Sequence, residues 1–251
     1  MASNEAHPAF PQPEDNAPIW RYMSLAKFLY LLRHRCLTFV RCDCLGDQYE
    51  ASYTNHDLQK ENAILDDLQM HTKNGNKAQE VFSEIRRNLP TWFYVSCWHM
   101  GDSESNAMWN QYGLGQEGIC IRSFYLRLHS LLPENVHLGK VTYLDYESQR
   151  FPTNTTNLYF PVMHKKRYFK DENEIRAVVS AIPIANAKWV PAGRNVEESR
   201  DVVVDVQKLV QEVILSPDAP DWMVSFLPEI VAALGYSFTV RKSSMTDPPR
   251  R

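Results

Sequence analysis

Several signals that would assign a function directly are absent from this sequence. It has only five cysteines in 251 residues and a net charge of −3, which argues against a disulfide scaffold and against a surface that is basic throughout. No apolar run approaches the roughly 20 residues of a membrane-spanning helix. The N-terminal 18 residues lack the basic and apolar segments of a secretory signal. These absences predict a cytoplasmic protein with reduced thiols.

Common catalytic fingerprints are also missing. The sequence contains no GxGxxG, GxxxxGK[ST], GxSxG or HExxH motif, which removes the usual Rossmann, P-loop, α/β-hydrolase and zincin interpretations. Cys42-x-Cys44 and Cys97-x-His99 contain suitable zinc ligands. Their spacing is shorter than the roughly two to four intervening residues of structural zinc sites. We therefore predict no metal site.

Strands and helices alternate here without a regular βαβ rhythm, which predicts an α+β fold in one domain. We expect a mixed, largely antiparallel sheet, continuous or split, flanked by helices. Residues 1–18 and 244–251 are expected to be loose tails, and residues 19–243 to form the domain. Within it, residues 57–88 form a helical insertion, and the aromatic and β-branched segment 93–100 forms a strand.

The segment HKKRYFKDENEIRAVVSA, residues 164–181, has the clearest chemical pattern. If a strand begins at Glu172, then Glu172, Glu174 and Arg176 share one face while the residues between them face the core. Basic side chains beside carboxylates suit a site that holds a phosphate-bearing ligand while one carboxylate takes part in the reaction. The alternative is an edge strand with a solvated charged face.

A second stretch, residues 93–113, is rich in aromatic and small polar side chains. Flat rings beside hydroxyl groups suit stacking and hydrogen bonding to a ring-bearing ligand. The alternative is a core role, because aromatic residues at helical spacing are usually buried. The candidate ligand-binding residues of this stretch are Ser96, Trp98, Trp109 and Tyr112.

Arg21 stands between Trp20 and Tyr22 where the ordered chain is expected to begin. An arginine between aromatic residues on a first strand can hold a phosphate or a carboxylate; the alternative is a surface arginine beside core aromatics. Asp47 and Glu50 lie in a loop, where acidic residues are usually turn formers or caps. The role of that loop is left open.

These motifs together resemble a known family. W-R-Y, S-C-W, M-W-x-Q-Y-G and K-K-R-x-F-x-x-E-x-E-I-R resemble elements of a widespread microbial domain family catalogued as a domain of unknown function. The resemblance extends over roughly residues 20 to 243. The chain departs from the family pattern in the loop Gly46–Glu50, where the family often has Asn-Asp-Pro-x-Glu. The family resemblance implies no activity.

At the level of short motifs the chain also resembles the ADP-ribosyltransferase fold, a split β-sheet that binds NAD without a Gly-rich loop. Arg21 comes early in the chain, Tyr94-Val95-Ser96 in the middle and Glu172-x-Glu174 late. The motifs of the ADP-ribosyltransferase fold follow in the same order. The resemblance implies an NAD-using transferase, such as a toxin or a phage-defence effector. NAD would be its substrate, and a protein or a nucleic acid the acceptor.

The same resemblance implies a role for each candidate residue. Glu174 would hydrogen-bond the ribose and stabilise the positive charge that develops as nicotinamide leaves. Glu172 would orient the acceptor, and Arg21 would hold a phosphate or a ribose hydroxyl. The remaining candidates for binding the nucleotide are Tyr22, Ser96, Trp98, Trp109, Tyr112, Lys166 and Arg176.

Two other classes of function stay open. In a metal-dependent nuclease, four acidic residues would coordinate Mg²⁺ through hard oxygen ligands, with Lys166 near the phosphate. These residues are Asp47, Glu50, Glu172 and Glu174. In a non-catalytic sensor or protein-binding module, the aromatic residues would recognise a small molecule or a protein. An active site would require Arg21, Trp98, Tyr112, Lys166 and Glu174 to line one pocket.

Overall fold

Strand β3 (Phe93–Met100) is the centre of the main sheet, because it pairs with three other strands, all antiparallel to it. The computed structural model describes residues 7–71, 75–112, 115–152, 157–183 and 193–247. In this part of the chain the main sheet has nine strands, in the order β11-β10-β4-β1-β3-β2-β9, with β8 and β5 joined at the other edge of β3. Its remaining strands are β1 (Pro18–Ser24), β2 (Cys36–Arg41), β4 (Gly118–Phe124), β5 (Val136–Lys140), β8 (Glu174–Ser180), β9 (Ser199–Val203), β10 (Glu212–Leu215) and β11 (Thr239–Lys242).

The sheet is split along one edge of β3. Strand β2 pairs with the beginning of β3 at Tyr94 and Val95, and β1 pairs with its end at His99 and Met100. Both partners leave β3 between these points, whereas β8 follows it over its whole length on the other edge. Only the pair β10–β11 is parallel in this sheet, so the expected mixed, largely antiparallel α+β fold is confirmed.

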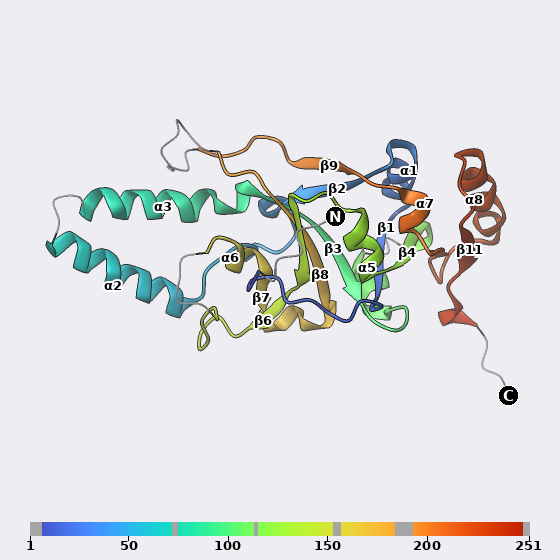
Figure 1. The fold of residues 1–251 in the computed structure, drawn as a ribbon. Helices are drawn as coiled ribbons and strands as arrows, with labels where there is room; N and C mark the ends of the chain where they lie inside the picture. Colours follow the sequence, from blue (N-terminus) through green and yellow to red (C-terminus); the bar gives the residue numbers. More distant parts are fainter. Residues whose placement is uncertain (1–6, 72–74, 113–114, 153–156, 184–192, 248–251) are drawn as a thin grey trace.

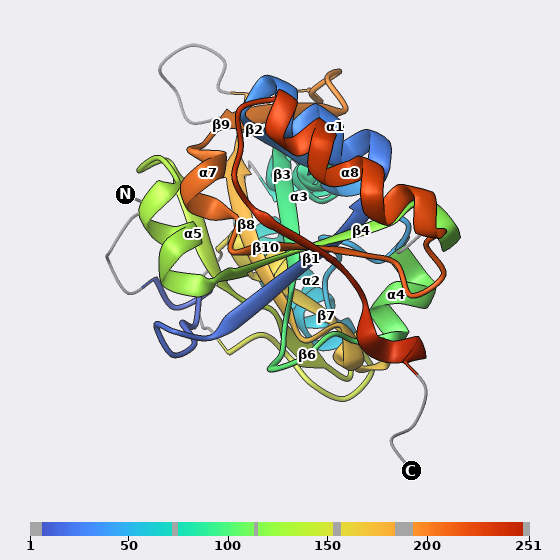
Figure 2. The same ribbon diagram turned by 90° about the vertical axis from the view of Figure 1, so that its right-hand side faces the viewer.

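Helices cover both faces of the sheet (Figures 1 and 2). They are α1 (Leu25–His34), α2 (Asn55–His71), α3 (Gly75–Trp92), α4 (Asn106–Tyr112), α5 (Tyr125–Leu131), α6 (Tyr159–Met163), α7 (Val206–Leu209) and α8 (Asp221–Ala233). Short 3₁₀ turns are η1 (Cys42–Cys44), η2 (Gly115–Glu117), η3 (Arg167–Glu172) and η4 (Ser244–Thr246). A second, two-stranded sheet joins β6 (Thr142–Leu144) to β7 (His164–Lys166).

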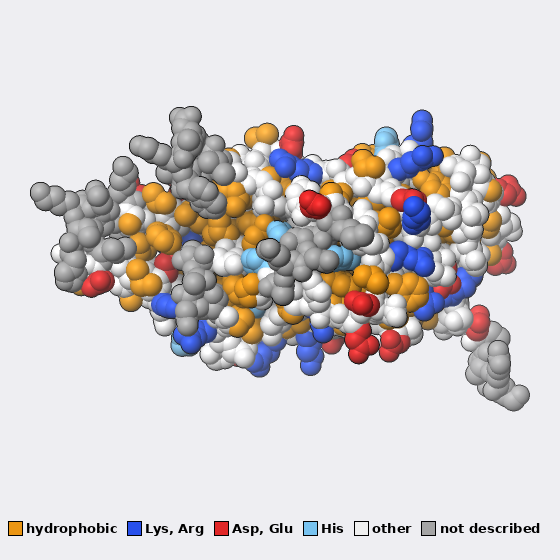
Figure 3. Space-filling model, viewed as in Figure 1, with side chains coloured by type: hydrophobic (Ala, Val, Ile, Leu, Met, Phe, Trp, Pro, Cys, Tyr) orange, Lys and Arg blue, Asp and Glu red, His pale blue; other side chains and the backbone are white. Residues whose placement is uncertain are grey.

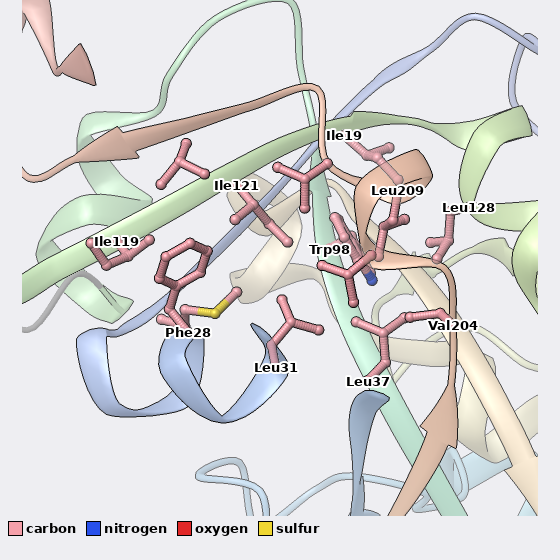
Figure 4. Close-up of a cluster of buried hydrophobic side chains, with 14 of the residues drawn as sticks. Ile19, Phe28, Leu31, Leu37, Trp98, Ile119, Ile121, Leu128, Val204 and Leu209 are labelled. Carbon is pink, nitrogen blue, oxygen red and sulfur yellow. The ribbon is translucent and has the colours of Figure 1, made fainter. Parts of the chain in front are cut away.

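Alternation along β3 divides the hydrophobic core into two parts. Tyr94 and Trp98 point to the face covered by α1, α5, α7 and α8, while Phe93 and Val95 point to the face covered by α3 and α6. Figure 4 shows the first core, in which Phe28 of α1 lies close to Ile119 and Ile121 of β4. Burial on both faces explains the nearly unbroken apolar sequence of the central strands.

The helical insertion expected at residues 57–88 is a hairpin of α2 and α3 that extends away from the sheet (Figure 1). Residues 72–74, between the two helices, lie outside the described part of the chain. Among the described helices, none combines the length and apolar character needed to cross a bilayer. Charged side chains of both signs are interspersed on the face shown in Figure 3.

Part of the N-terminal segment expected to be a loose tail packs on the domain. Ala9 and Phe10 are buried, and the Phe10 ring stacks on His137 of β5 at a centroid distance of 5.0 Å. The neighbouring Gly139 lies so close that a Cβ there would come within 2.7 Å of the Phe10 Cα. Residues 1–6 and 248–251, the outer ends of both expected tails, lie outside the described chain.

The strand expected to begin at Glu172 begins at Glu174 instead. Glu172 ends the 3₁₀ turn η3, and Asn173 follows in the left-handed conformation with φ of 38°. Its side chain donates a hydrogen bond to the Met100 carbonyl over 2.6 Å, which holds this turn against the end of β3. The prediction that Glu172 shares a strand face with Glu174 and Arg176 was therefore wrong for Glu172.

Candidate functional site

A cavity of about 970 Å³ opens where β1 and β2 separate from β3. Cys97, Trp98 and His99 of β3 and Arg21 and Tyr22 of β1 contribute to its wall. Helix α4, strand β7, turn η3 and the loop of residues 45–50 enclose it from the other sides. The cavity therefore brings together residues from segments that are far apart in the sequence.

Arg21 spans the split in the sheet. Its Nη2 donates to the Thr38 carbonyl of β2 over 3.1 Å, and its guanidinium carbon lies 5.7 Å from the centroid of the Trp98 ring. Among the described residues it forms no ion pair with a carboxylate. Burial lowers the pKa of Arg21 to about 10, which still leaves it a cation at neutral pH. The cavity therefore contains a positive charge that keeps free donors and has no carboxylate partner in the described parts of the chain.

A cluster of five buried charged residues forms another part of the wall. It consists of Glu50, Lys165, Glu172, Glu174 and Arg176. Arg176 is fully buried and donates to both oxygens of Glu174, over 2.6 and 2.9 Å, and to both oxygens of Glu50, over 2.8 and 3.0 Å. Its fifth bond reaches the Val162 carbonyl over 2.6 Å, so every N–H group of the guanidinium is used.

Lys165 joins the third carboxylate to the cluster. Its Nζ lies 2.7 Å from Glu172 Oε2, 3.1 Å from Glu50 Oε1 and 3.7 Å from Glu174 Oε2. Burial by itself would raise the pKa of Glu174, but Arg176 and Lys165 outweigh it and hold that pKa below its usual value. With all five groups ionised, three carboxylates against two cations leave the cluster with one net negative charge.

Glu172 is the carboxylate with the most adaptable partners. Its Oε1 accepts a hydrogen bond from the Tyr112 hydroxyl over 3.0 Å and from the Gln111 amide over 3.3 Å. Both donors lie on α4 with exposed side chains, so they can turn away when a ligand offers its own hydroxyl. The Glu172 main chain is fixed, since its carbonyl lies 2.6 Å from His99 Nδ1.

The mouth of the cavity carries several exposed aromatic rings. Tyr49, Tyr112 and Tyr168 are 42%, 39% and 84% exposed, and all three line the cavity. Lys166 Nζ lies over the Tyr49 ring, 3.2 Å from its centroid, a cation–π contact that ties β7 to the loop of residues 45–50. Flat rings at an opening offer stacking surfaces to a ring-bearing ligand.

Most of the residues proposed from the sequence meet at this cavity. Arg21, Tyr22, Trp98, Tyr112, Lys166, Glu172 and Glu174 all line it, including the five that a single active site requires. The last residue of the M-W-x-Q-Y-G element, at position 113, lies outside the described residues.

Three proposed ligand-binding residues, Ser96, Trp109 and Arg176, do not line this cavity. Ser96 is buried on the same face of β3 as Tyr94, outside the cavity lining, and its hydroxyl has no partner in the described chain. Trp109 packs beside Tyr22 in a small core, and its Nε1 donates to Glu104 over 3.1 Å. Arg176 has no donor left for a ligand, because five protein acceptors occupy it.

The sequence interpretation missed Glu50, Lys165 and His99 as parts of the candidate transferase site. Glu50 is separated from Arg176 by 126 positions, and no local pattern indicates such a pairing. Both Lys165 and Lys166 line the cavity, but Lys165 is buried while Lys166 is half-exposed. No local pattern in the sequence distinguishes the two lysines.

No group of three or more His, Cys, Asp or Glu side chains in the described parts of the chain is arranged to hold a metal ion. All five cysteines are free thiols. Burial raises the pKa of the Cys97 thiol well above its usual value, so this cavity-lining sulfur is protonated at neutral pH.

Comparison with known proteins identifies no family for this chain. No protein-family model matches it, and no curated protein matches its sequence. Among solved structures, it is similar to that of Thermus sp. 2.9 DarT in complex with ADP-ribosylated ssDNA. The identity is 10% and the TM-score 0.40, with 93% of this chain and 96% of that chain covered. A TM-score of 0.40 at 10% identity shows neither a shared family nor a shared activity.

Proposed function

We propose that the protein is an ADP-ribosyltransferase-like enzyme that cleaves NAD between nicotinamide and ribose and transfers the ADP-ribose to an acceptor. One observation carries the proposal. Arg21, which has no carboxylate partner among the described residues, and the buried cluster, with a formal net charge of −1, border one cavity; Arg21 lies on β1, and Glu174 and Arg176 of the cluster lie on β8. NAD has the matching charges, a pyrophosphate and a ribose that becomes cationic during the reaction.

Arg21 is proposed to bind the pyrophosphate. The guanidinium keeps donors beyond the bond to Thr38, and its planar fork suits phosphate oxygens. Water competes little inside a partly closed cavity, so a charge-assisted hydrogen bond of this type contributes about 1.5–3 kcal/mol to binding.

Glu174 is proposed to stabilise the transition state. Each of its oxygens accepts one hydrogen bond from Arg176, the Cys97 thiol is a further donor, and the carboxylate keeps acceptor capacity beyond these bonds. The carboxylate is therefore held in place and ionised, yet able to accept a bond from a ribose hydroxyl. As nicotinamide leaves, positive charge develops on the ribose, and a preorganised negative group beside it lowers the barrier.

Glu172 is proposed to orient the acceptor. It lies at the side of the cavity next to α4, where Gln111 and Tyr112 are its replaceable partners. A protein or a nucleic acid remains the acceptor class, and the exposed rings of Tyr49 and Tyr168 lie at the opening through which it would approach. On the motif resemblance, we further propose a role as a toxin or phage-defence effector.

The nuclease alternative requires carboxylate oxygens that are free to bind Mg²⁺. In this cluster Glu50, Glu172 and Glu174 already accept bonds from Lys165 and Arg176. Two fixed cations oppose the approach of a divalent ion. The transferase therefore fits these residues better than the nuclease does.

The experiment is incubation of the purified full chain with NAD, with nicotinamide measured by chromatography. We expect nicotinamide release that persists in the presence of a chelator, and faster release when the acceptor is supplied. A Glu134→Gln protein, changed at an exposed position away from the cavity, should match the unaltered protein. If a well-folded protein releases no nicotinamide, either alone or after cell extract is added as a source of acceptor, the proposal is contradicted.

A further inference from the structure

We propose that Glu50 is a positioning residue for the reaction: acting through Arg176 and Lys165, it sets the charge and the orientation of Glu174 and Glu172. This inference rests on the proposed function. Glu50 lies in the loop that follows η1, far in sequence from the strand and turn that carry the other two carboxylates.

The geometry shows why Glu50 acts through other residues. Its side chain is only 3% exposed, and both oxygens accept bonds from the Arg176 guanidinium, over 2.8 and 3.0 Å. One of these oxygens also lies 3.1 Å from Lys165 Nζ. Arg176 is therefore paired with both Glu50 and Glu174, and Lys165 with both Glu50 and Glu172.

Removing the Glu50 charge would change the electrostatics of the whole cluster. Two carboxylates and two cations would remain, and the net charge would change from −1 to zero. An oxocarbenium-like ribose is stabilised by the field of the entire preorganised cluster, in which water screens little. The Arg176 guanidinium lies between Glu50 and Glu174. Loss of the Glu50 charge would consequently raise the barrier to nicotinamide release, although Glu174 itself is unchanged.

Glu50 also anchors a wall of the cavity. Residues 45–49 precede it and line the cavity, and Tyr49 is held from the outside by Lys166. Glu50 turns inward from this loop and reaches the centre of the ionic cluster. Because one ion-paired side chain joins the loop to the reacting groups, the loop cannot shift without disturbing them.

The test compares Glu50→Gln with the matched surface change Glu134→Gln. Glutamine preserves the volume and one acceptor, so the melting temperature should fall by only a few degrees. We expect kcat for NAD to fall about 10- to 100-fold, as for other partners that orient a reacting group, while KM stays within about threefold. Glu134→Gln should leave both constants unchanged.

A charge-compensating double variant distinguishes this role from a merely structural one. Adding Lys165→Met to Glu50→Gln removes one positive charge and returns the cluster to a net charge of −1. We expect kcat of the double variant to exceed that of Glu50→Gln alone, whereas independent structural losses would combine to a lower value. The pair Arg176–Glu174 remains in the double variant, which allows the test even where Glu50→Gln alone folds poorly.

Two outcomes overturn the inference by itself: unchanged kcat in a folded Glu50→Gln protein, or a double variant slower than Glu50→Gln. The unaltered protein turns over NAD in both cases, so the proposed function survives. Absence of NAD turnover in the unaltered protein would overturn the function and this inference together.

Discussion

Arg176 and Glu174 lie two positions apart on β8, and the guanidinium of Arg176 donates to both oxygens of Glu174, over 2.6 and 2.9 Å. The pair is buried, and Glu50 binds the same guanidinium from another side. Alternation along the strand puts both side chains on one face. A carboxylate at the cavity is thus kept ionised by a cation that belongs to the core of the protein.

We expect Arg176→Leu to destabilise the fold severely. It would leave Glu50 and Glu174 buried with only Lys165 as a shared cation, and removing one partner from a buried ion pair costs about 3–5 kcal/mol. Urea denaturation measures the change. The exposed Arg150 provides the control, and Arg150→Leu should shift the free energy of unfolding by less than about 0.5 kcal/mol. Equal stability of the two variants would show that the cluster contributes little to folding.

Arg21→Gln should weaken NAD binding and leave the fold intact. Loss of one charge-assisted contact to phosphate, about 1.5–3 kcal/mol, raises KM for NAD about 10- to 100-fold, with kcat nearly unchanged if the contact is the same in the ground and transition states. The melting temperature should change little, because Arg21 is only half-buried and has no carboxylate partner among the described residues. Arg33→Gln, at an exposed position of α1, is the control. A lower kcat at unchanged KM would contradict a role in pyrophosphate binding.

The buried imidazole of His164 should make stability depend on pH. Burial lowers its pKa to about 4 from the ordinary 6.5, against an opposing hydrogen bond to the Phe160 carbonyl. Its Nε2 has no partner in the described structure. Between pH 6.5 and 4, the unfolded chain therefore binds a proton at His164 that the folded protein does not. Protonation of the unfolded state lowers the free energy of unfolding as the pH falls from 6.5 toward 4, and this effect is absent above pH 6.5. The loss is on the order of 3 kcal/mol.

His164→Gln tests that dependence. Urea midpoints measured between pH 7 and 4 should fall less steeply in the variant than in the unaltered protein. Glu174 also has a lowered pKa and loses stabilisation in acid, but this contribution is common to both proteins and cancels in their difference. Parallel curves for the two proteins would show that His164 is not the titrating group.

The sequence predicts the central strand and the helical hairpin well because each has a strong local pattern. Residues 93–100 combine aromatic and β-branched side chains, and the segment 57–88 has polar, helix-forming composition bounded by turn residues. The motifs around Arg21 and Glu174 contain residues that line one cavity in the structure.

The errors come from features that no local pattern contains. Asn173 adopts a left-handed conformation that separates Glu172 from the strand, and a strand pattern with period 2 does not show it. Arg176 was expected to face a ligand, but its partner Glu50 lies 126 positions away. Ser96 lies between Val95 and Cys97, which line the cavity, but strand alternation turns its side chain to the other face of β3.

The most direct test of the account is the rate of nicotinamide release from NAD by Glu174→Gln, measured beside a melting curve. Glutamine keeps the volume of the side chain and one acceptor for Arg176, and Glu50 remains as a counter-charge. We predict a rate lower by about 10²–10³-fold, the usual effect of removing one preorganised electrostatic contact, in a protein that is still folded. Full activity in a folded Glu174→Gln protein would contradict the assignment of this carboxylate to the reaction.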